Sequence, residues 1–294
     1  MSKGILFFAY NNNEIDYVSM AMVNALFVKK HFTDPNISIV TDEGSYEYTK
    51  YIFGEDLFNR AFDKVIFDQL PRINNSRSIR DSYYTEKTLP WKNTNRVRAY
   101  NLTPYNETLV LDVDYLVQNN ILEQVFGNSE EFLMNNTVIP LLRTQPFLNS
   151  EYRLSSSGIR QYWATAFYFR KGKFSERIFD LTNHIFDNYD YYRIIYGLKG
   201  KTIRNDYIFS IALHEISGFF GAEIKNLPIP YILSSPDFDV LWQVRNEELF
   251  FLSAKPDIVE EFIMTKSQNV NIHIMNKQSF IRNIPELLKG FENV

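Results

Sequence analysis

The chain of 294 residues contains no cysteine, so a disulfide framework and a thiolate-bound metal site are both excluded. It also lacks any uninterrupted apolar run near the length that a transmembrane helix needs. The first ten residues carry one lysine and a short apolar run, a pattern typical of a strand and not of a signal peptide. We therefore expect a protein of a reducing compartment, the cytoplasm, without a membrane span.

An excess of positive charge is lacking as well. The formal net charge is −4, which gives no global reason to expect binding to nucleic acid or to anionic membranes. One segment differs, because seven cations accompany only two acids between Pro71 and Tyr100. The cations of this basic segment are Arg72, Arg77, Arg80, Lys87, Lys92, Arg96 and Arg98. The segment predicts either a local contact with an anion or a solvated loop.

Strand and helix patterns alternate along the chain, as in an α/β sheet that binds its ligand at the carboxyl ends of the strands. We expect strands at residues 4–10, 37–41, 64–67, 109–117, 138–142 and 165–170. We expect helices at residues 14–31, 46–53, 93–102, 174–188 and 206–215. Residues 71–80 are polar and are expected to be irregular.

Two acids stand one residue apart inside the apolar run of residues 109–117. On a strand, Asp112 and Asp114 would point to the same face and present their oxygens together. Neighbouring acids in apolar surroundings raise each other's pKa unless a cation neutralises them. The pair therefore predicts a divalent ion that in turn holds a phosphate. A pair of acids that caps the turn after a strand is the structural alternative.

Around this pair the chain resembles the family 8 glycosyltransferases, the glycogenin and bacterial galactosyltransferase group. The resemblance is densest, and needs no gap, between Asn95 and Phe126. The matching positions are Arg96, Tyr100, Leu102, Thr103 and Tyr105 before the pair, and Leu116, Val117, Asn120, Ile121, Glu123 and Phe126 after it. The resemblance implies a GT-A fold, which is an α/β, Rossmann-like, nucleotide-sugar-binding fold with a mixed central sheet.

The same resemblance implies one domain over residues 1–294. Its nucleotide-binding half would span residues 1–130, its acceptor half residues 131–238, and a C-terminal wrap residues 239–294. A nucleotide sugar, with UDP as the nucleotide, is the implied donor. Residues implied to contact it lie after the first strand and around the acid pair: Tyr10, Asn11, Asn12, Asn13, Tyr17, Arg96, Asp112, Val113 and Lys277.

His273 is implied as the third metal ligand beside Asp112 and Asp114, because residues 270–277 resemble the family's late histidine element. Two carboxylates and one imidazole favour Mn²⁺ over Mg²⁺. Arg96 is assigned to the diphosphate, whose oxygens a guanidinium can bind bidentately, and Lys277 joins it there. A core histidine and a solvated helix face are the respective alternatives for His273 and Arg96.

Other family positions are altered. Residues 163–170 lack the family's Asn and Gly, residues 205–207 lack its Gln, and residues 270–277 lack its Gly, Pro and Trp. Asp206 is the candidate catalytic group near the sugar, together with Arg96 at the leaving group. An N-cap of the following helix is the alternative role for Asp206.

These features predict a metal-dependent glycosyltransferase, transferring a hexose or pentose to an acceptor hydroxyl, with retention implied by the resemblance. The acceptor is a glycan, a protein or another hydroxyl compound. A non-catalytic sugar-nucleotide-binding or glycan-binding protein is an alternative. A phosphatase of the haloacid dehalogenase type is rejected, because its acid pair lies on the first strand and is normally followed by threonine.

A phage origin gives a further alternative. The chain is rich in residues with A- and T-rich codons, as in a low-GC bacterium or its phage. Tyr83, Tyr84 and Trp91 interleave with the basic segment as candidate stacking groups. The acceptor would then be hydroxymethylated pyrimidines in duplex DNA, modified in the host cytoplasm.

Overall fold

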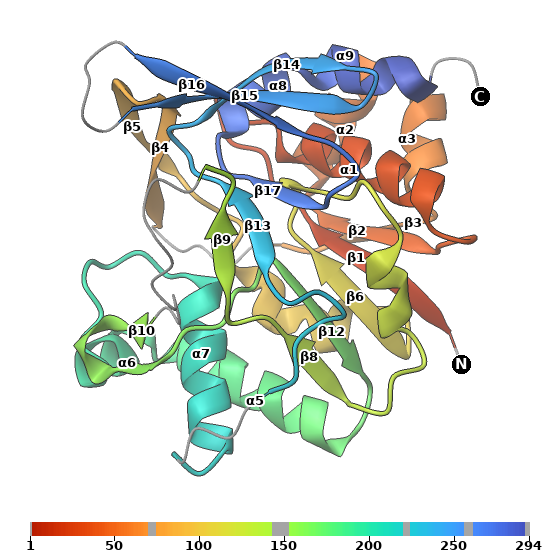
Figure 1. Ribbon diagram of the computed structural model, residues 1–294. Helices are drawn as coiled ribbons and strands as arrows, with labels where there is room; N and C mark the ends of the chain where they lie inside the picture. The colour runs from red at the N-terminus through yellow and green to blue at the C-terminus, as the bar shows by residue number, and fades with distance from the viewer. Residues whose placement is uncertain (1, 70–74, 143–152, 220–223, 256–260, 292–294) are drawn as a thin grey trace.

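A computed structural model describes residues 2–69, 75–142, 153–219, 224–255 and 261–291. Its centre is a six-stranded sheet in the order β3-β2-β1-β6-β12-β8 (Figure 1). The strands are β1 (Lys3–Phe8), β2 (Ile37–Thr41), β3 (Lys64–Phe67), β6 (Glu107–Leu111), β8 (Phe132–Met134) and β12 (Ala166–Arg170). The first four strands of that order are parallel, whereas β12 is antiparallel to both of its neighbours. The predicted α/β fold with a mixed central sheet is therefore confirmed.

The strand order reverses at β1, since β2 and β3 follow on one side of it and β6 lies on the other. In open α/β sheets, ligands bind in the crevice outside the carboxyl ends of the strands at such a switch point. The segments that leave β1 and β6 meet there. The segment after β1 is the loop that contains Asn11, Asn12 and Asn13. The segment after β6 is the turn that carries Asp112 and Asp114.

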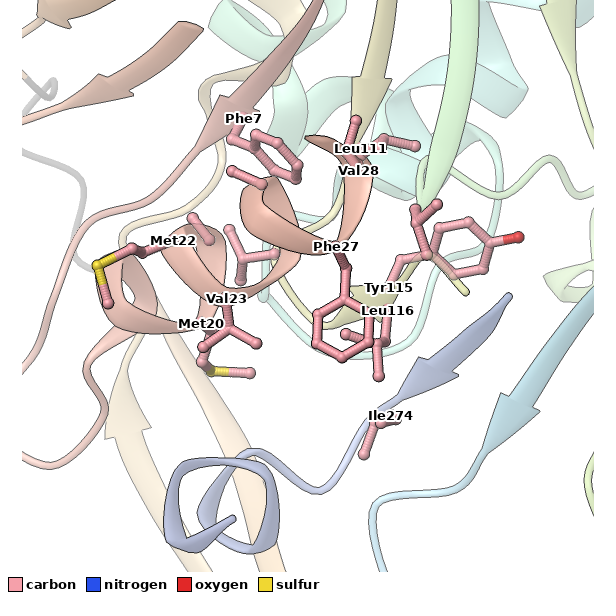
Figure 2. Close-up of a cluster of buried hydrophobic side chains, with 14 of the residues drawn as sticks. Phe7, Met20, Met22, Val23, Phe27, Val28, Leu111, Tyr115, Leu116 and Ile274 are labelled. Carbon is pink, nitrogen blue, oxygen red and sulfur yellow. The ribbon is translucent and has the colours of Figure 1, made fainter. Parts of the chain in front are cut away.

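Helices cover both faces of the central sheet. The side chains of β1 alternate, so Phe7 faces α1 (Tyr17–His31) while Phe8 faces α5 (Lys173–Asp187) and α7 (Asn205–Ile216). Residues 17–28 of α1 are all buried, because this helix also packs against a second sheet (Figure 2). The remaining helices of this half are α2 (Glu43–Phe53), α3 (Glu55–Ala61) and α4 (Ala99–Leu102).

The second sheet joins distant parts of the chain. Its order is β7 (Tyr115–Leu116), β17 (Ile272–Ile274), β13 (Ile232–Ser235) and β9 (Val138–Pro140). Strand β17 pairs antiparallel with β7, which places His273 opposite Tyr115. This pairing brings the late histidine to the acid pair.

Several elements differ from the sequence prediction. The prediction of an irregular segment at 71–80 is wrong where it is described, because β4 (Ser76–Ser82) and β5 (Thr85–Pro90) form an antiparallel hairpin. Residues 71–74 lie outside the described part of the chain. The sequence analysis assigned no strand or helix after residue 215, where β14 (Val240–Arg245), β15 (Glu248–Ala254) and β16 (Phe262–Ser267) form a separate antiparallel sheet.

Shorter elements complete the chain: β10 (Arg153–Leu154), β11 (Ile159–Arg160), α6 (Tyr189–Ile195), α8 (Lys277–Arg282) and α9 (Ile284–Leu288). Within the described ranges, none of the helices combines the length and apolar character that crossing a membrane requires. The division of the chain into halves and a wrap stays a prediction.

Candidate metal and phosphate site

Asp112 and Asp114 lie in a turn directly after β6, and the prediction that they stand on a strand is wrong. The strand ends at Leu111, because the Asp112 carbonyl accepts a hydrogen bond from the Tyr115 N–H (3.1 Å) and closes a turn. The Asp112 N–H donates to the Thr165 carbonyl (2.7 Å), which ties this turn to the start of β12. The two carboxylates still converge.

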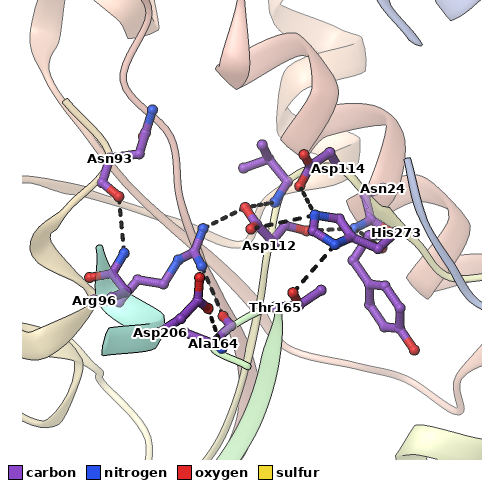
Figure 3. Close-up of polar contacts among 12 residues, drawn as sticks. Asn24, Asn93, Arg96, Asp112, Asp114, Ala164, Thr165, Asp206 and His273 are labelled. Carbon is purple, nitrogen blue, oxygen red and sulfur yellow. Dashed lines mark hydrogen bonds and ion pairs between the residues drawn. The ribbon is translucent and has the colours of Figure 1, made fainter. Parts of the chain in front are cut away.

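His273 completes a cluster with the two acids. One potential ligand atom from each of Asp112, Asp114 and His273 lies within 4.8 Å of the other two. His273 Nε2 is 3.2 Å from Asp114 Oδ1 and 3.9 Å from Asp112 Oδ2 (Figure 3). Asp114 and His273 are buried, whereas Asp112 remains partly exposed. Oxygen and imidazole donors that converge in this way suit a divalent cation.

Two cations bind the other oxygens of the same carboxylates. Arg96 forms an ion pair with Asp112 Oδ1, and the Lys277 ammonium lies 2.6 Å from Asp114 Oδ2. Both cations are buried. Each acid thus has one oxygen held by a protein cation and one oxygen near His273. A divalent ion fits this arrangement without displacing either Arg96 or Lys277 from its carboxylate.

The two acids differ in their pKa values. Burial raises the pKa of Asp112, although the Arg96 guanidinium opposes this rise. Burial would also raise the pKa of Asp114, but Lys277 and His273 outweigh it and hold that pKa well below its usual range. Asp114 is therefore firmly ionised, while Asp112 gains most from an additional positive charge.

Asn24 holds the turn from the side of α1, and the sequence analysis missed it. This fully buried side chain donates to the carbonyls of Asp112 (3.3 Å) and Tyr115 (2.6 Å) and accepts from the Val117 N–H (3.1 Å). An amide within an otherwise mainly apolar helix was the available signal. Its bonds fix the backbone on both sides of Asp114.

Thr165 is a second residue that the sequence analysis missed. Its hydroxyl lies 3.4 Å from His273 Nδ1, and its carbonyl accepts the hydrogen bond from Asp112. When Nδ1–H donates to this hydroxyl, the Nε2 lone pair faces the two acids, which is the tautomer that binds a metal. Thr165 is thus placed to orient both ligands.

Asp206 lies beside Arg96, on the far side from His273 (Figure 3). Its Oδ1 accepts a hydrogen bond from the Ala164 N–H (2.8 Å), while the Ala164 carbonyl accepts one from Arg96 (2.8 Å). Arg204 binds the other oxygen at 3.0 Å. The N-cap alternative for Asp206 is wrong, since Arg204 holds that position and Asp206 lies inside α7.

The loop after β1 uses most of its polar side chains to shape itself. Asn11 and Asn12 both accept hydrogen bonds from backbone N–H groups of residues 14–18, and Asn13 is exposed. Tyr10 is fully buried, and its hydroxyl accepts a hydrogen bond from the Asn95 side chain (2.6 Å). The buried Tyr17 hydroxyl has no partner within the described ranges.

The basic segment is largely paired inside the protein. Its pairs are Arg80 with Glu86, Lys87 with Glu14, Arg96 with Asp112, Arg98 with Asp68, and Arg77 against the Trp91 ring. Arg72 lies outside the described residues. Four of the six described cations therefore have an acidic partner, while Lys92 is exposed and forms no ion pair with a described residue.

Comparison with known proteins yields no matching family model and no matching curated protein. Among solved structures, the galactosyltransferase LgtC in complex with donor and acceptor sugar analogues is similar at 13% identity and a TM-score of 0.47, over 76% of this chain and 72% of that one. The glycosyltransferase GlyE of Streptococcus pneumoniae TIGR4 is similar at 9% identity and a TM-score of 0.37, over 77% of this chain and 45% of that one. Likenesses of this size assign neither a family nor an activity, so the function is argued from the site.

Proposed function

We propose that the chain is a metal-dependent glycosyltransferase that moves a sugar from a UDP sugar to an acceptor hydroxyl, with retention of configuration. The observation that carries the proposal is the convergence of Asp112, Asp114 and His273 at the switch point of the sheet. Buried acids that converge on an imidazole are the donor set of a metal that binds phosphate oxygens.

Mn²⁺, or Mg²⁺ in its place, supplies positive charge to the departing diphosphate when it is bound. The imidazole of His273 favours Mn²⁺. Arg96 and Lys277 orient the two carboxylates through their far oxygens, and both cations are buried, so they add fixed positive charge. The buried Arg96 Nε has no partner within the described ranges, so a ligand oxygen would satisfy it.

Asp206 and Arg96 are the proposed catalytic residues. The Ala164 peptide joins them, because its N–H binds Asp206 and its carbonyl binds Arg96. This arrangement sets a carboxylate beside the guanidinium that we propose as the partner of the leaving group. Asp206 is held by two donors, which suits a group that orients or stabilises the sugar as positive charge develops on it.

The uridine is proposed to bind the loop after β1 and the backbone around Val113. Asn13 is exposed in this loop, and the Tyr17 hydroxyl has no hydrogen-bond partner among the described residues. The acceptor is proposed as a hydroxyl compound other than DNA, since the cations that favoured DNA are mostly engaged in ion pairs within the protein.

Release of UDP from UDP sugars with Mn²⁺, in the absence of an acceptor, tests the proposal. We expect slow hydrolysis of one donor by the wild type and a loss of about 10²-fold or more for Asp112→Asn and Asp114→Asn. Asp190→Asn is the matched control, because this side chain is 84% exposed on α6. Wild-type rates in both site variants would contradict the metal assignment. Binding of a UDP sugar without any turnover would favour the non-catalytic alternative.

A further inference from the structure

Helix α6 presents apolar side chains on two opposite faces. Tyr189 and Tyr192 point inward and pack with α7 in a buried cluster. Tyr191, Ile194 and Ile195 are 63%, 70% and 56% exposed. Their spacing of three and four residues places them on one side of the helix. A short surface helix needs only one apolar face to pack, and no described part of the chain covers the outward face.

Uncompensated positive charge borders that outward face. Lys199 and Lys201 are exposed and form no ion pair with any described residue. Asp190, the only acid from Tyr189 to Lys201, is paired with Arg193. Residues 189–201 therefore carry a local charge of +2, with Asp187 just before them, although the whole chain carries a net charge of −4.

The α6 region lies at the periphery of the molecule. Figure 1 shows α6 at the edge of the molecule, beside β10 and away from the central sheet. The segment after it turns tightly, with Gly197 and Gly200 in the left-handed backbone region at φ values of 61° and 78°. The lysines follow directly on the exposed isoleucines through this turn.

We propose that this α6 tip, formed by Tyr191, Ile194, Ile195, Lys199 and Lys201, docks the protein on an anionic lipid surface. Exposed aliphatic side chains with a tyrosine beside them insert into the boundary between headgroups and acyl chains. Exposed lysines that follow this face in the chain would bind the anionic headgroups. This surface is independent of the proposed sugar transfer.

A second protein is a poorer match for the α6 tip. A stable protein interface buries about 800 Å² on each partner, whereas three protruding side chains supply at most on the order of 500 Å². A protein partner would also need acidic groups opposite two lysines that lie beyond the apolar face. A lipid surface meets both the apolar and the cationic part without such matching.

Co-sedimentation of the full chain with vesicles tests the inference. We expect binding to phosphatidylcholine vesicles that contain phosphatidylglycerol, much weaker binding to pure phosphatidylcholine, and loss of binding as salt is added. The Ile194→Ser/Ile195→Ser variant should bind about tenfold or more weakly for each isoleucine removed. The Lys199→Gln/Lys201→Gln variant should lose about fivefold for each lysine.

Tyr51→Ser is the matched control, because Tyr51 is 87% exposed on α2 and its neighbour Lys50 is neutralised by Glu55. This control should bind vesicles as the wild type does. Failure of the wild type to bind anionic vesicles, or equal binding by all four proteins, would overturn the proposal. Sedimentation velocity without lipid provides the other decisive outcome: a wild-type dimer that the Ile194→Ser/Ile195→Ser variant converts to monomer would assign the α6 tip to contact between copies of this chain.

Discussion

The two acids of the candidate metal site draw their partners from different parts of the chain. Asp112 is paired with Arg96, sixteen positions earlier and close to the same strand of the first sheet. Asp114 is held by His273 and Lys277, which lie 159 and 163 positions later. The ion pair of Asp112 is thus formed by residues that lie close together in the sequence, next to β6 of the first sheet. The Asp114 side exists only when β17 has docked on β7, so the C-terminal segment completes the site.

The largest difference between the two sides is expected on removing charge. Asp114→Asn leaves the Lys277 ammonium buried without a counterion, and breaking a buried pair in this way costs about 3–5 kcal/mol. Asp112→Asn should cost less, because the Asp112 side chain is 19% exposed whereas that of Asp114 is 1% exposed. Urea unfolding of both variants measures the difference.

The double variant Asp114→Asn/Lys277→Met is the control for that experiment. It leaves no unpaired charge, so it should regain most of the lost stability while Mn²⁺ binding stays absent. A single Asp112→Asn substitution that destabilises as much as Asp114→Asn would remove the distinction between the two sides.

A pH-dependent effect is expected in the C-terminal part, at Asp239 in front of β14. Burial raises the pKa of this carboxyl to about 6, although the nearby Ser253 hydroxyl opposes the rise. The folded protein therefore binds a proton more tightly than the unfolded chain, and stability falls as the pH rises from about 4 to about 6, by about 3 kcal/mol in total.

Asp239→Asn removes the carboxyl that titrates. We expect a flatter stability profile between pH 4 and pH 7 (about the range spanned by the two pKa values) and a more stable protein at neutral pH. Thermal unfolding across this range measures the profile. An unchanged slope in the variant would show that another group is responsible.

A smaller effect is expected at Asn24, whose side chain forms hydrogen bonds with the turn that carries both acids. Asn24→Ala removes three hydrogen bonds to the turn, which should cost about 2 kcal/mol and weaken Mn²⁺ binding about tenfold. Asn135→Ala is the matched control, since this fully buried amide bonds to the backbone of Leu227 and Ile229, away from the acids. Equal loss of Mn²⁺ affinity in both variants would indicate a general loss of stability and no specific role for Asn24.

The smallest effect is expected at Thr165, which contacts both sides through Asp112 and His273. Thr165→Val removes the hydroxyl that faces His273 Nδ1 and should weaken Mn²⁺ binding about tenfold, with about 1 kcal/mol lost in stability. Thr165→Ser keeps the hydroxyl and should restore binding. Failure of the serine variant to do so would assign the effect to packing of the methyl group.

The difference between Asp112, with a partner nearby in the sequence, and Asp114, with distant partners, also explains which features the sequence could predict. The strands of the first sheet follow from short apolar runs, and the acid pair stands out because charge is rare in such runs. The end of β6 at Leu111 could not be seen, because the run continues as apolar on both sides of the acids through Val117. The chain turns there through hydrogen bonds within the turn and to Thr165 and Asn24. The β4–β5 hairpin was missed since its turn lies at Tyr83 and Tyr84, without the usual glycine or asparagine.

No local sequence pattern predicts the partners of Asp114. His273 was expected at the metal site from family resemblance, but its position depends on one short strand pairing between β17 and β7. Lys277 was assigned to the diphosphate, whereas its ammonium lies against Asp114. Contacts across more than 150 positions depend on tertiary packing, which composition and periodicity do not encode.

Calorimetric titration of Mn²⁺ into the protein, with UDP present, tests the central claim most directly. The account predicts one Mn²⁺ bound per chain by the wild type, and an affinity lowered by about 10²-fold or more in His273→Ala, whose side chain joins the two sides of the site. Binding of Mn²⁺ by His273→Ala with wild-type affinity would contradict the claim that the C-terminal segment completes the metal site.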